Sequence, residues 1–311
     1  MIIEDNSTPS IDIREDYLAI NDNLLELLLK DNTTSQNILW ATDSYEEKGT
    51  FFSQSAQITT ELITGKYGSL IQPRAVKSKE EQIIRTRDKA EVFTPLHIVK
   101  QMNEATNSKR VTKNNWQEFV ALIKLEITCG EAPYIVSRYD PVSDKQKLIS
   151  LSKRVGFLDS KLNIISKYCN THKEWVKWAK IAFQNSYGYD WQGDSLLIAR
   201  ENLLYTFIDY YKDKFNRNPS LSLQKEIAEI IVWNIFQMDG IRYVVPMSCK
   251  NEEILIKGEE TLFEKKEDYF FKKPCSGCEK KTPHNHNGVY VKIMDWRNNK
   301  TIRFVDIVSN N

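Results

Sequence analysis

The chain lacks the features that mark membrane-spanning and secreted proteins. Its 311 residues contain no run of eighteen apolar residues, and no charged and then apolar leader follows Met1. Membrane insertion and secretion are therefore not expected. Cysteine is scarce, and five residues in a chain without a leader are more typical of a reducing cytoplasm than of a disulfide framework. We expect a cytoplasmic protein.

An excess of charge of one sign is also absent. The chain has 43 basic and 42 acidic residues, so its formal net charge of +1 provides no argument for nucleic-acid binding. Residues 77–89, "KSKEEQIIRTRDK", mix both signs, which predicts an exposed, solvated face. The alternative is that a DNA backbone passes along basic residues in and just before this segment, namely Arg74, Lys77, Lys79, Arg85 and Arg87.

The composition is that of a folded globular protein, with 41% hydrophobic and 27% charged residues. Helical spacing predicts helices over residues 172–188, 194–215 and 221–240. Gly188 is the expected C-terminal cap of the first helix, and Asp194 the expected N-terminal cap of the second. Candidate strands cover residues 241–247, 289–296 and 301–308. This mixture of helices and strands predicts an α/β sheet.

Three segments contain the small and polar residues of a ligand site. They are "AEVFTP" (90–95), "LEITCGEAP" (125–133) and "YGYDWQGDSLLIARENLL" (187–204). A glycine at the end of a strand, such as Gly130, lets backbone N–H groups come close to a ligand. An acid after a second strand, such as Asp190, can accept hydrogen bonds from two ribose hydroxyls.

Each segment also has an explanation that needs no ligand. Thr94 can cap a helix that Pro95 begins, and Asp190 can be a surface or capping residue. Glu126, next to a buried strand, needs a partner, which can be the ammonium group of a cofactor or an arginine such as Arg138. The residues alone leave these alternatives open.

In their order and spacing the three segments resemble the N6-adenine DNA methyltransferases, in particular the modification subunits of type I restriction systems. The resemblance covers roughly residues 85 to 245. It implies a partial Rossmann-like methyltransferase sheet that binds S-adenosylmethionine. The resemblance also implies contact with DNA and with partner subunits. The cofactor-binding residues that it implies are Phe93, Thr94, Pro95, Glu126, Thr128, Cys129, Gly130 and Asp190, with Ala90 where the family often has glycine.

One motif of that family is missing. Its amino-methylating members carry (N/D/S)-P-P-(Y/F/W) after the fourth strand, where the motif holds the target amino group and stacks on a flipped base. No such tetrapeptide occurs in this chain. The stand-ins are Asp295 and Trp296, an acid and an aromatic residue after a candidate strand, which we take as the candidate catalytic residues.

A second constellation lies in "PCSGCEKKTPHNHNG", residues 274–288. Cys275 and Cys278 have C-x-x-C spacing, and His284 and His286 follow, so this set predicts a structural zinc site with tetrahedral coordination. The alternative is a polar hairpin loop with reduced cysteines. The remaining cysteines, Cys129, Cys169 and Cys249, lack such spacing and are expected to be buried thiols.

These observations predict three regions: a mainly helical region over residues 1–84, a methyltransferase-like core over 85–250, and a C-terminal hairpin region with a zinc knuckle over 251–311. The predicted function is that of an S-adenosylmethionine-dependent DNA adenine methyltransferase-like protein of a restriction-modification or phage-defence system. The alternative is a non-catalytic DNA- or protein-binding module that retains the scaffold.

Overall fold

The computed structural model describes residues 22–89, 91–106, 111–142, 147–257 and 268–309. The chain divides into two compact units, Met1–Gln237 and Met238–Asn311. The boundaries expected after residues 84 and 250 stay predictions. The protein is a mixed α/β protein with small sheets, as the alternation of helical and strand patterns predicts.

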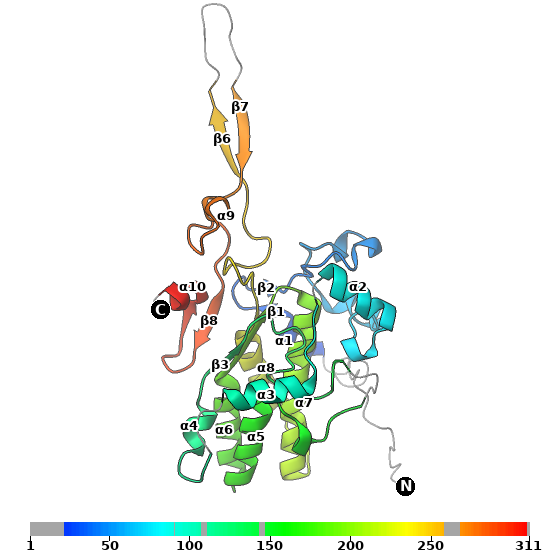
Figure 1. Ribbon diagram of the computed structural model, residues 1–311, viewed down its shortest axis with the longest axis vertical. Helices are drawn as coiled ribbons and strands as arrows, with labels where there is room; N and C mark the ends of the chain where they lie inside the picture. Colours follow the sequence, from blue (N-terminus) through cyan, green and yellow to red (C-terminus); the bar gives the residue numbers. More distant parts are fainter. Residues whose placement is uncertain (1–21, 90, 107–110, 143–146, 258–267, 310–311) are drawn as a thin grey trace, which may run out of the picture. The chain divides into compact units, whose positions relative to one another are not determined.

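The first unit is built around a parallel sheet of three strands. β3 (Lys124–Glu126), β4 (Ser186–Asp190) and β5 (Ile235–Gln237) lie in this order, with β4 in the centre (Figure 1). In register, Leu125 lies opposite Tyr187 and Gly188 lies opposite Ile235. Because the strands are parallel, the turns that follow β3 and β4 come together at the carboxyl edge of the sheet.

Helices connect these strands. The chain passes from β3 to β4 through α5 (Phe157–Tyr168) and α6 (His172–Gln184), and from β4 to β5 through α7 (Gly193–Phe215) and α8 (Leu221–Asn234). α5 packs against both α6 and α7 (Figure 1). α7 is buried along most of its length and contacts β4 and β5, so it is the centre of the core.

The described residues before the sheet contain short helices, short strands and 3₁₀ turns. The described elements are α1 (Asp22–Leu29), β1 (Lys30–Asp31), β2 (Gln36–Asn37), α2 (Lys79–Lys89), α3 (Leu96–Ala105) and α4 (Trp116–Val120). Short 3₁₀ turns occupy much of residues 46–76. The Gln237 side chain joins this region to β5, because its amide accepts a hydrogen bond from the Leu39 N–H and donates to the Leu39 carbonyl, each at 2.8 Å.

The second unit consists of two antiparallel hairpins and short helices. Its elements are β6 (Glu252–Ile256), β7 (Tyr269–Lys273), α9 (Ser276–Lys280), β8 (Lys292–Asp295), β9 (Lys300–Arg303) and α10 (Phe304–Ser309). β6 pairs with β7, and β8 pairs with β9. The strand predicted over 241–247 forms only an isolated bridge between Val244 and Tyr290. The strand expected over 301–308 ends at Arg303, and α10 begins at the next residue, Phe304.

Three helix ends differ from the predicted ones. The helix expected over 172–188 ends at Gln184, so Gly188 is a buried strand residue of β4 and not a cap. The helix expected over 221–240 ends at Asn234, where β5 begins. Asp194 lies inside the first turn of α7, and Gln192 occupies the cap position. No helix of the described residues is both long and apolar enough to cross a bilayer.

Candidate functional site

A cavity of about 450 Å³ lies at the carboxyl edge of the parallel sheet in the first unit. Three segments that are far apart in the sequence line it, within residues 91–94, 126–134 and 190–195. Of the residues that the family resemblance implies, Phe93, Thr94, Glu126, Thr128, Cys129, Gly130 and Asp190 line this cavity. Pro95 is not among the lining residues, and Ala90 lies outside the described residues.

The turn after β3 has an unusual backbone. Thr128, Gly130 and Ala132 all have positive φ angles, of 46°, 52° and 62°. Left-handed backbone of this kind is costly for residues other than glycine and persists where the surrounding structure holds it. Ala132 thus adopts a left-handed conformation that glycine adopts more readily. The Cys129 N–H donates to the Tyr189 carbonyl of β4 at 2.8 Å, and this hydrogen bond holds the turn against the end of β4.

Asp190 links the two turns at this edge. Its Oδ2 accepts a hydrogen bond from the Gly130 N–H at 2.8 Å, and its Oδ1 accepts from the Gln192 N–H at 2.9 Å. Burial raises the pKa of Asp190 to about 6, although these two N–H groups act in the opposite direction. The carboxyl group therefore shapes the pocket, and each oxygen has a further lone pair for a ligand hydroxyl.

Glu126 finds a partner that the sequence reasoning does not predict. Its two oxygens accept hydrogen bonds from the backbone N–H groups of Tyr134 and Ile135, at 3.3 and 3.1 Å. Burial raises the pKa of Glu126 well above its usual value. Arg138, the arginine considered for this role, is instead 3.3 Å from Asp209. Glu126 is thus held at the pocket by backbone alone.

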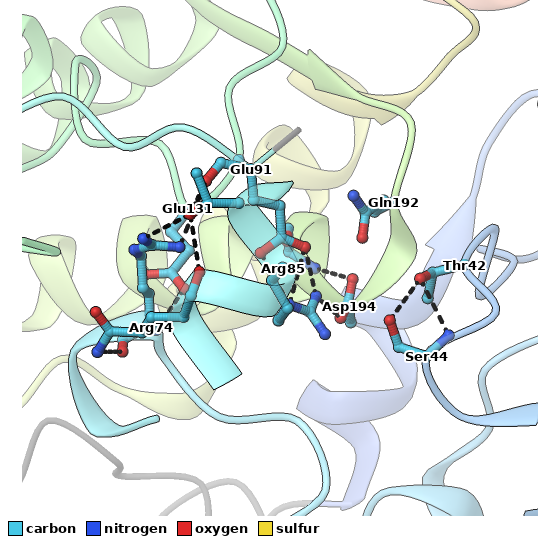
Figure 2. Close-up of polar contacts among 12 residues, drawn as sticks. Thr42, Ser44, Arg74, Arg85, Glu91, Glu131, Gln192 and Asp194 are labelled. Atoms are coloured by element: carbon cyan, nitrogen blue, oxygen red, sulfur yellow. Dashed lines mark hydrogen bonds and ion pairs between the residues drawn. The ribbon is translucent and has the colours of Figure 1, made fainter. Parts of the chain in front are cut away.

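The Glu131 side chain faces away from the pocket. Its carboxylate is buried and accepts hydrogen bonds from the Arg74 N–H and the Tyr139 hydroxyl, both at 2.7 Å. Its backbone carbonyl accepts a hydrogen bond from the Asn202 amide of α7 at 3.1 Å. Figure 2 shows Glu131 beside Arg74. Glu131 therefore anchors the turn and is not among the residues that line the cavity.

The segment "FTP" lies on the other side of the turn. A Cβ atom on Gly130 would be 3.6 Å from the Phe93 ring, and the Arg74 guanidinium lies over this ring, 4.8 Å from its centroid. α3 begins at Leu96, so Pro95 occupies the cap position and Thr94 is not the cap. Thr94 is thus a lining residue of the pocket.

Beneath the pocket lies a buried ion-pair network. One guanidinium nitrogen of Arg85 is 2.6 Å from both Glu91 and Asp194, and Asp194 also accepts a hydrogen bond from the Tyr45 hydroxyl (Figure 2). Arg85 is only 4% exposed, which excludes it from a DNA-contacting surface and corrects the expected solvated face at this position. Burial lowers the pKa of Arg74, and its guanidinium donates to the Thr86 hydroxyl at 3.0 Å.

Two residues beside Asp190 complete the lining. Trp191 is fixed because its indole N–H donates to the Ala41 carbonyl at 2.8 Å. The side-chain oxygen of Gln192 is buried and has no hydrogen-bond partner among the described residues, and Figure 2 draws this side chain without any contact to its labelled neighbours. A buried acceptor without a partner that borders a cavity is suited to a ligand donor.

The charge of the lining has one sign. Glu91, Glu126 and Asp190 contribute three carboxyl groups, whereas none of the described residues that line the cavity is lysine, arginine or histidine. Sites that hold phosphate groups use basic side chains or helix N-termini. Glu91 is paired with Arg85, and burial raises the pKa of Glu126 and of Asp190, so the lining offers carboxyl groups as hydrogen-bond partners. Gln192 and Ser195, at the N-terminus of α7, also line the cavity.

The candidate catalytic residues lie in the second unit. Asp295 ends β8 and accepts hydrogen bonds from the N–H groups of Arg297 and Asn298 and from the Asn298 amide. The turn that joins β8 to β9 thus uses both oxygens of this carboxylate. Trp296 is half-buried in the same turn. Neither residue lines the cavity of the first unit.

The second unit contains a group of four potential metal ligands. Cys249, Cys275, Cys278 and His286 place one ligand atom each within 4.8 Å of all the others. The His286 Nδ1 atom lies 3.5, 3.6 and 3.6 Å from the three sulfur atoms. Tetrahedral zinc, with Zn–S of about 2.3 Å and Zn–N of about 2.1 Å, requires S···N distances of about 3.6 Å. The Cys₃His group can therefore hold a metal ion.

Contacts around His286 orient its ring. The second ring nitrogen, Nε2, is 2.8 Å from the Thr282 carbonyl, so Nε2 carries the proton and Nδ1 keeps its lone pair for a metal. Gly277 approaches this ring so closely that a Cβ atom there would be 2.7 Å from it. These contacts position one imidazole ligand.

The predicted ligand set is therefore corrected at one position. His284 is exposed and does not belong to the group, and Cys249 replaces it. The hydrogen bonds between Lys250 and the Asn287 amide, at 3.0 and 2.8 Å, bring the Cys249 segment beside His286. C-x-x-C spacing cannot reveal a ligand from so distant a segment.

Comparisons with protein-family models, with curated proteins and with solved structures found no match.

Proposed function

We propose that the cavity at the edge of the parallel sheet binds S-adenosylmethionine and that the chain is a methyltransferase-like component of a DNA-modification or phage-defence system. The observation that carries this proposal is the acidic lining without a basic side chain. S-adenosylmethionine is a nucleoside with a sulfonium and an ammonium group and no phosphate, so it does not need the basic side chains that the described lining residues lack.

The residues present fit this cofactor in three further respects. Phe93 and the backbone at Gly130 form a cradle that a side chain at Gly130 would partly fill. Asp190 and the Gln192 oxygen offer acceptors for the ribose hydroxyls or the adenine amino group. The cavity volume of about 450 Å³ lies within the range of small-molecule sites. We include in this proposal that the chain is related to the N6-adenine DNA methyltransferases and that its parallel sheet is a partial Rossmann-like sheet.

When bound, the cofactor would supply an electrophilic methyl group. In this chain Glu126 would hold the cationic part of the cofactor, and Asp190 would hold its ribose. The turn at Gly130 would fix the distance between these two carboxyl groups. Methyl transfer to an adenine amino group would depend on positioning and would need no covalent nucleophile. The alternative function is a non-catalytic DNA- or protein-binding module. One observation supports this alternative: both oxygens of Asp295, the candidate catalytic acid, are engaged in a turn.

Isothermal calorimetry tests the proposal. The intact chain should bind S-adenosylmethionine and should bind ATP at least about a hundredfold more weakly, which corresponds to about 2.7 kcal/mol. Asp190→Ala should abolish binding of S-adenosylmethionine, whereas Asp88→Ala, at an exposed acid of α2, should retain it. Absence of binding by the intact chain would refute the proposal.

Transfer of a labelled methyl group to unmethylated DNA then separates the two functions. Incorporation that Asp190→Ala removes supports the enzyme. Cofactor binding without incorporation supports the non-catalytic module.

For the second unit we infer that the metal is zinc and that its role is structural. Three thiolates and one imidazole prefer zinc, and four protein ligands leave no position for a catalytic water. Elemental analysis of the purified chain should find about one zinc per chain.

A further inference from the structure

A second cavity of the first unit has a basic lining. Its volume is about 500 Å³, and residues of α3, of the segment before α5 and of the first turn of α5 line it. Lys100, Lys153 and Arg154 contribute three cationic groups, against the single carboxylate of Glu104. The candidate cofactor pocket, in contrast, has no basic residue in its described lining. The two cavities are therefore suited to different chemical groups.

Arg154 is the buried cation of this cavity. It is only 7% exposed, and two of its three guanidinium nitrogens are already engaged. Its Nε donates to the Ile149 carbonyl at 3.1 Å, and its Nη2 donates to the Asp209 carboxylate at 2.6 Å. Nη1 is buried and has no hydrogen-bond partner among the described residues. Neither Ile149 nor Asp209 lines the cavity, so Nη1 is the guanidinium nitrogen that remains for a ligand there.

The carboxyl groups near Arg154 leave this nitrogen without an acceptor. Asp209 is shared with Arg138, whose Nε lies 3.3 Å from the same oxygen that Arg154 contacts. Oδ2 of Asp159, the other buried carboxyl group nearby, accepts the N–H groups of Ser137 and Gly156 instead. A buried charged donor without an acceptor costs free energy, so an acceptor that enters the cavity would be stabilised.

The rest of the lining adds groups that bind anions. Lys100 and Lys153 are exposed, and their flexible side chains can turn toward a ligand. Glu104 is 3.9 Å from the Lys100 ammonium, which is a loose and exposed pair. Ser160 lies in the first turn of α5, a helix of twelve residues, and the positive end of the helix dipole favours a negative charge at this position.

These groups match the chemistry of phosphate. A phosphate group carries one or two negative charges on several oxygens, and arginine and lysine side chains are its usual protein partners. The cavity also has the size of a small-molecule site. A cationic ligand would meet three like charges here, and an apolar ligand would leave the Arg154 donor unpaired.

From these observations we propose that the cavity between α3 and the start of α5 binds a phosphate group. The Arg154 guanidinium and the ammonium groups of Lys100 and Lys153 hold this phosphate. It belongs either to a small phosphate ester or to the backbone of DNA, which present the same oxygens. The site is separate from the candidate cofactor pocket and does not depend on the function proposed for that pocket.

Equilibrium dialysis of the full chain against radiolabelled inorganic phosphate, at constant ionic strength, tests this site. The wild type should bind phosphate saturably. Arg154→Gln and Lys153→Glu should each raise the dissociation constant at least about tenfold, because each removes a charge-assisted partner. Since Arg154 is buried, its replacement can disturb the fold, and the exposed Lys153 provides the variant that avoids this problem. Circular dichroism verifies that both variants are folded.

Lys167→Glu is the matched control. Lys167 is an exposed lysine in the last turn of α5, so this variant changes the net charge as Lys153→Glu does, but it lies outside the lining of the cavity. It should leave the dissociation constant of phosphate unchanged. This comparison separates a local site from the general attraction between an anion and a basic chain.

Competition distinguishes the two sources of the phosphate group. A short DNA duplex should displace the labelled phosphate if the site takes a DNA backbone. Displacement by glycerol 3-phosphate but not by the duplex assigns the site to small phosphate esters.

The proposal is overturned if the wild type binds no phosphate, or if Arg154→Gln and Lys153→Glu bind it as tightly as the wild type does. It is equally overturned if Lys167→Glu weakens binding as much as Lys153→Glu. Binding of S-adenosylmethionine is measured separately, and Lys153→Glu should leave it unchanged. Failure of either proposal is therefore distinguishable from failure of the other.

Discussion

The two candidate sites differ in what holds their residues in place. In the first unit, the acids of the pocket already have protein partners: Asp190 is bound by the Gly130 and Gln192 N–H groups, and Glu126 by those of Tyr134 and Ile135. In the second unit, the four potential ligand atoms lie within 4.8 Å of one another, and β6 and β7 are largely exposed.

This difference follows from the size of the two cores. α7 alone contains more buried residues than the short elements of the second unit contain together. A small core supplies little hydrophobic stabilisation, and small domains therefore often depend on a metal. The first unit should thus be stable without a ligand, whereas the second should depend on its metal. The following experiments test this contrast, from the largest expected effect to the smallest.

Loss of the metal should have the largest effect. Cys249→Ser should abolish zinc binding and the order of the second unit, because structural zinc contributes about 10 kcal/mol or more in small domains. The unfolding midpoint of the first unit in urea should remain unchanged. Zinc content and limited proteolysis measure the two effects. His284→Ala is the control and should keep its zinc, and the reverse result for the two variants would contradict the Cys₃His ligand set.

A side chain at Gly193 should selectively damage the first unit. A Cβ atom there would lie 2.0 Å from the Leu39 carbonyl oxygen, so backbone must move. We expect Gly193→Ala to destabilise the first unit by about 3 kcal/mol in urea unfolding and to leave the zinc content unchanged. Gly277→Ala, against the His286 ring, should have the opposite pattern. Equal effects of both variants on both units would contradict the contrast.

Asp190 should make the stability of the first unit depend on pH. Its pKa is raised from 3.8 to about 6 in the folded chain. Between these values the folded state keeps a proton that the unfolded state has released, so stability decreases as the pH rises. Relative to Asp190→Asn, the wild type should lose up to about 3 kcal/mol between pH 4 and 6, and nothing further above that. Urea unfolding at each pH measures this difference, and a constant difference would contradict the raised pKa.

The smallest effect is expected at the edge of the pocket. Trp191→Phe removes the hydrogen bond from the indole N–H to the Ala41 carbonyl and should cost about 1 kcal/mol of unfolding free energy. Chemical denaturation of the first unit measures it. A much larger loss would show that the pocket depends on Trp191 packing rather than on the backbone contacts of Asp190.

Several residues of the site could be predicted from the sequence and others could not. Phe93, Cys129 and Asp190 line one cavity, as a shared ligand site requires, although their roles toward a cofactor remain predictions. The partners of Glu126 were not predictable, because backbone N–H groups have no signature in the sequence. Glu131 is bound by one backbone N–H, that of Arg74, and by the Tyr139 hydroxyl, a pair that only tertiary packing brings together. The boundary between α8 and β5 was missed because apolar residues continue with little interruption from Ile230 to Phe236.

Local pattern was enough for features whose causes lie within a few residues. The C-x-x-C pair of Cys275 and Cys278 and the approximate extent of α7 are of this kind, since spacing and helical periodicity act over one or two turns. Tertiary structure alone decided that Cys249 joins that pair and that the Glu131 carboxylate faces Arg74. These contacts join segments far apart in the chain, so their energies depend on packing, which periodicity and spacing do not encode.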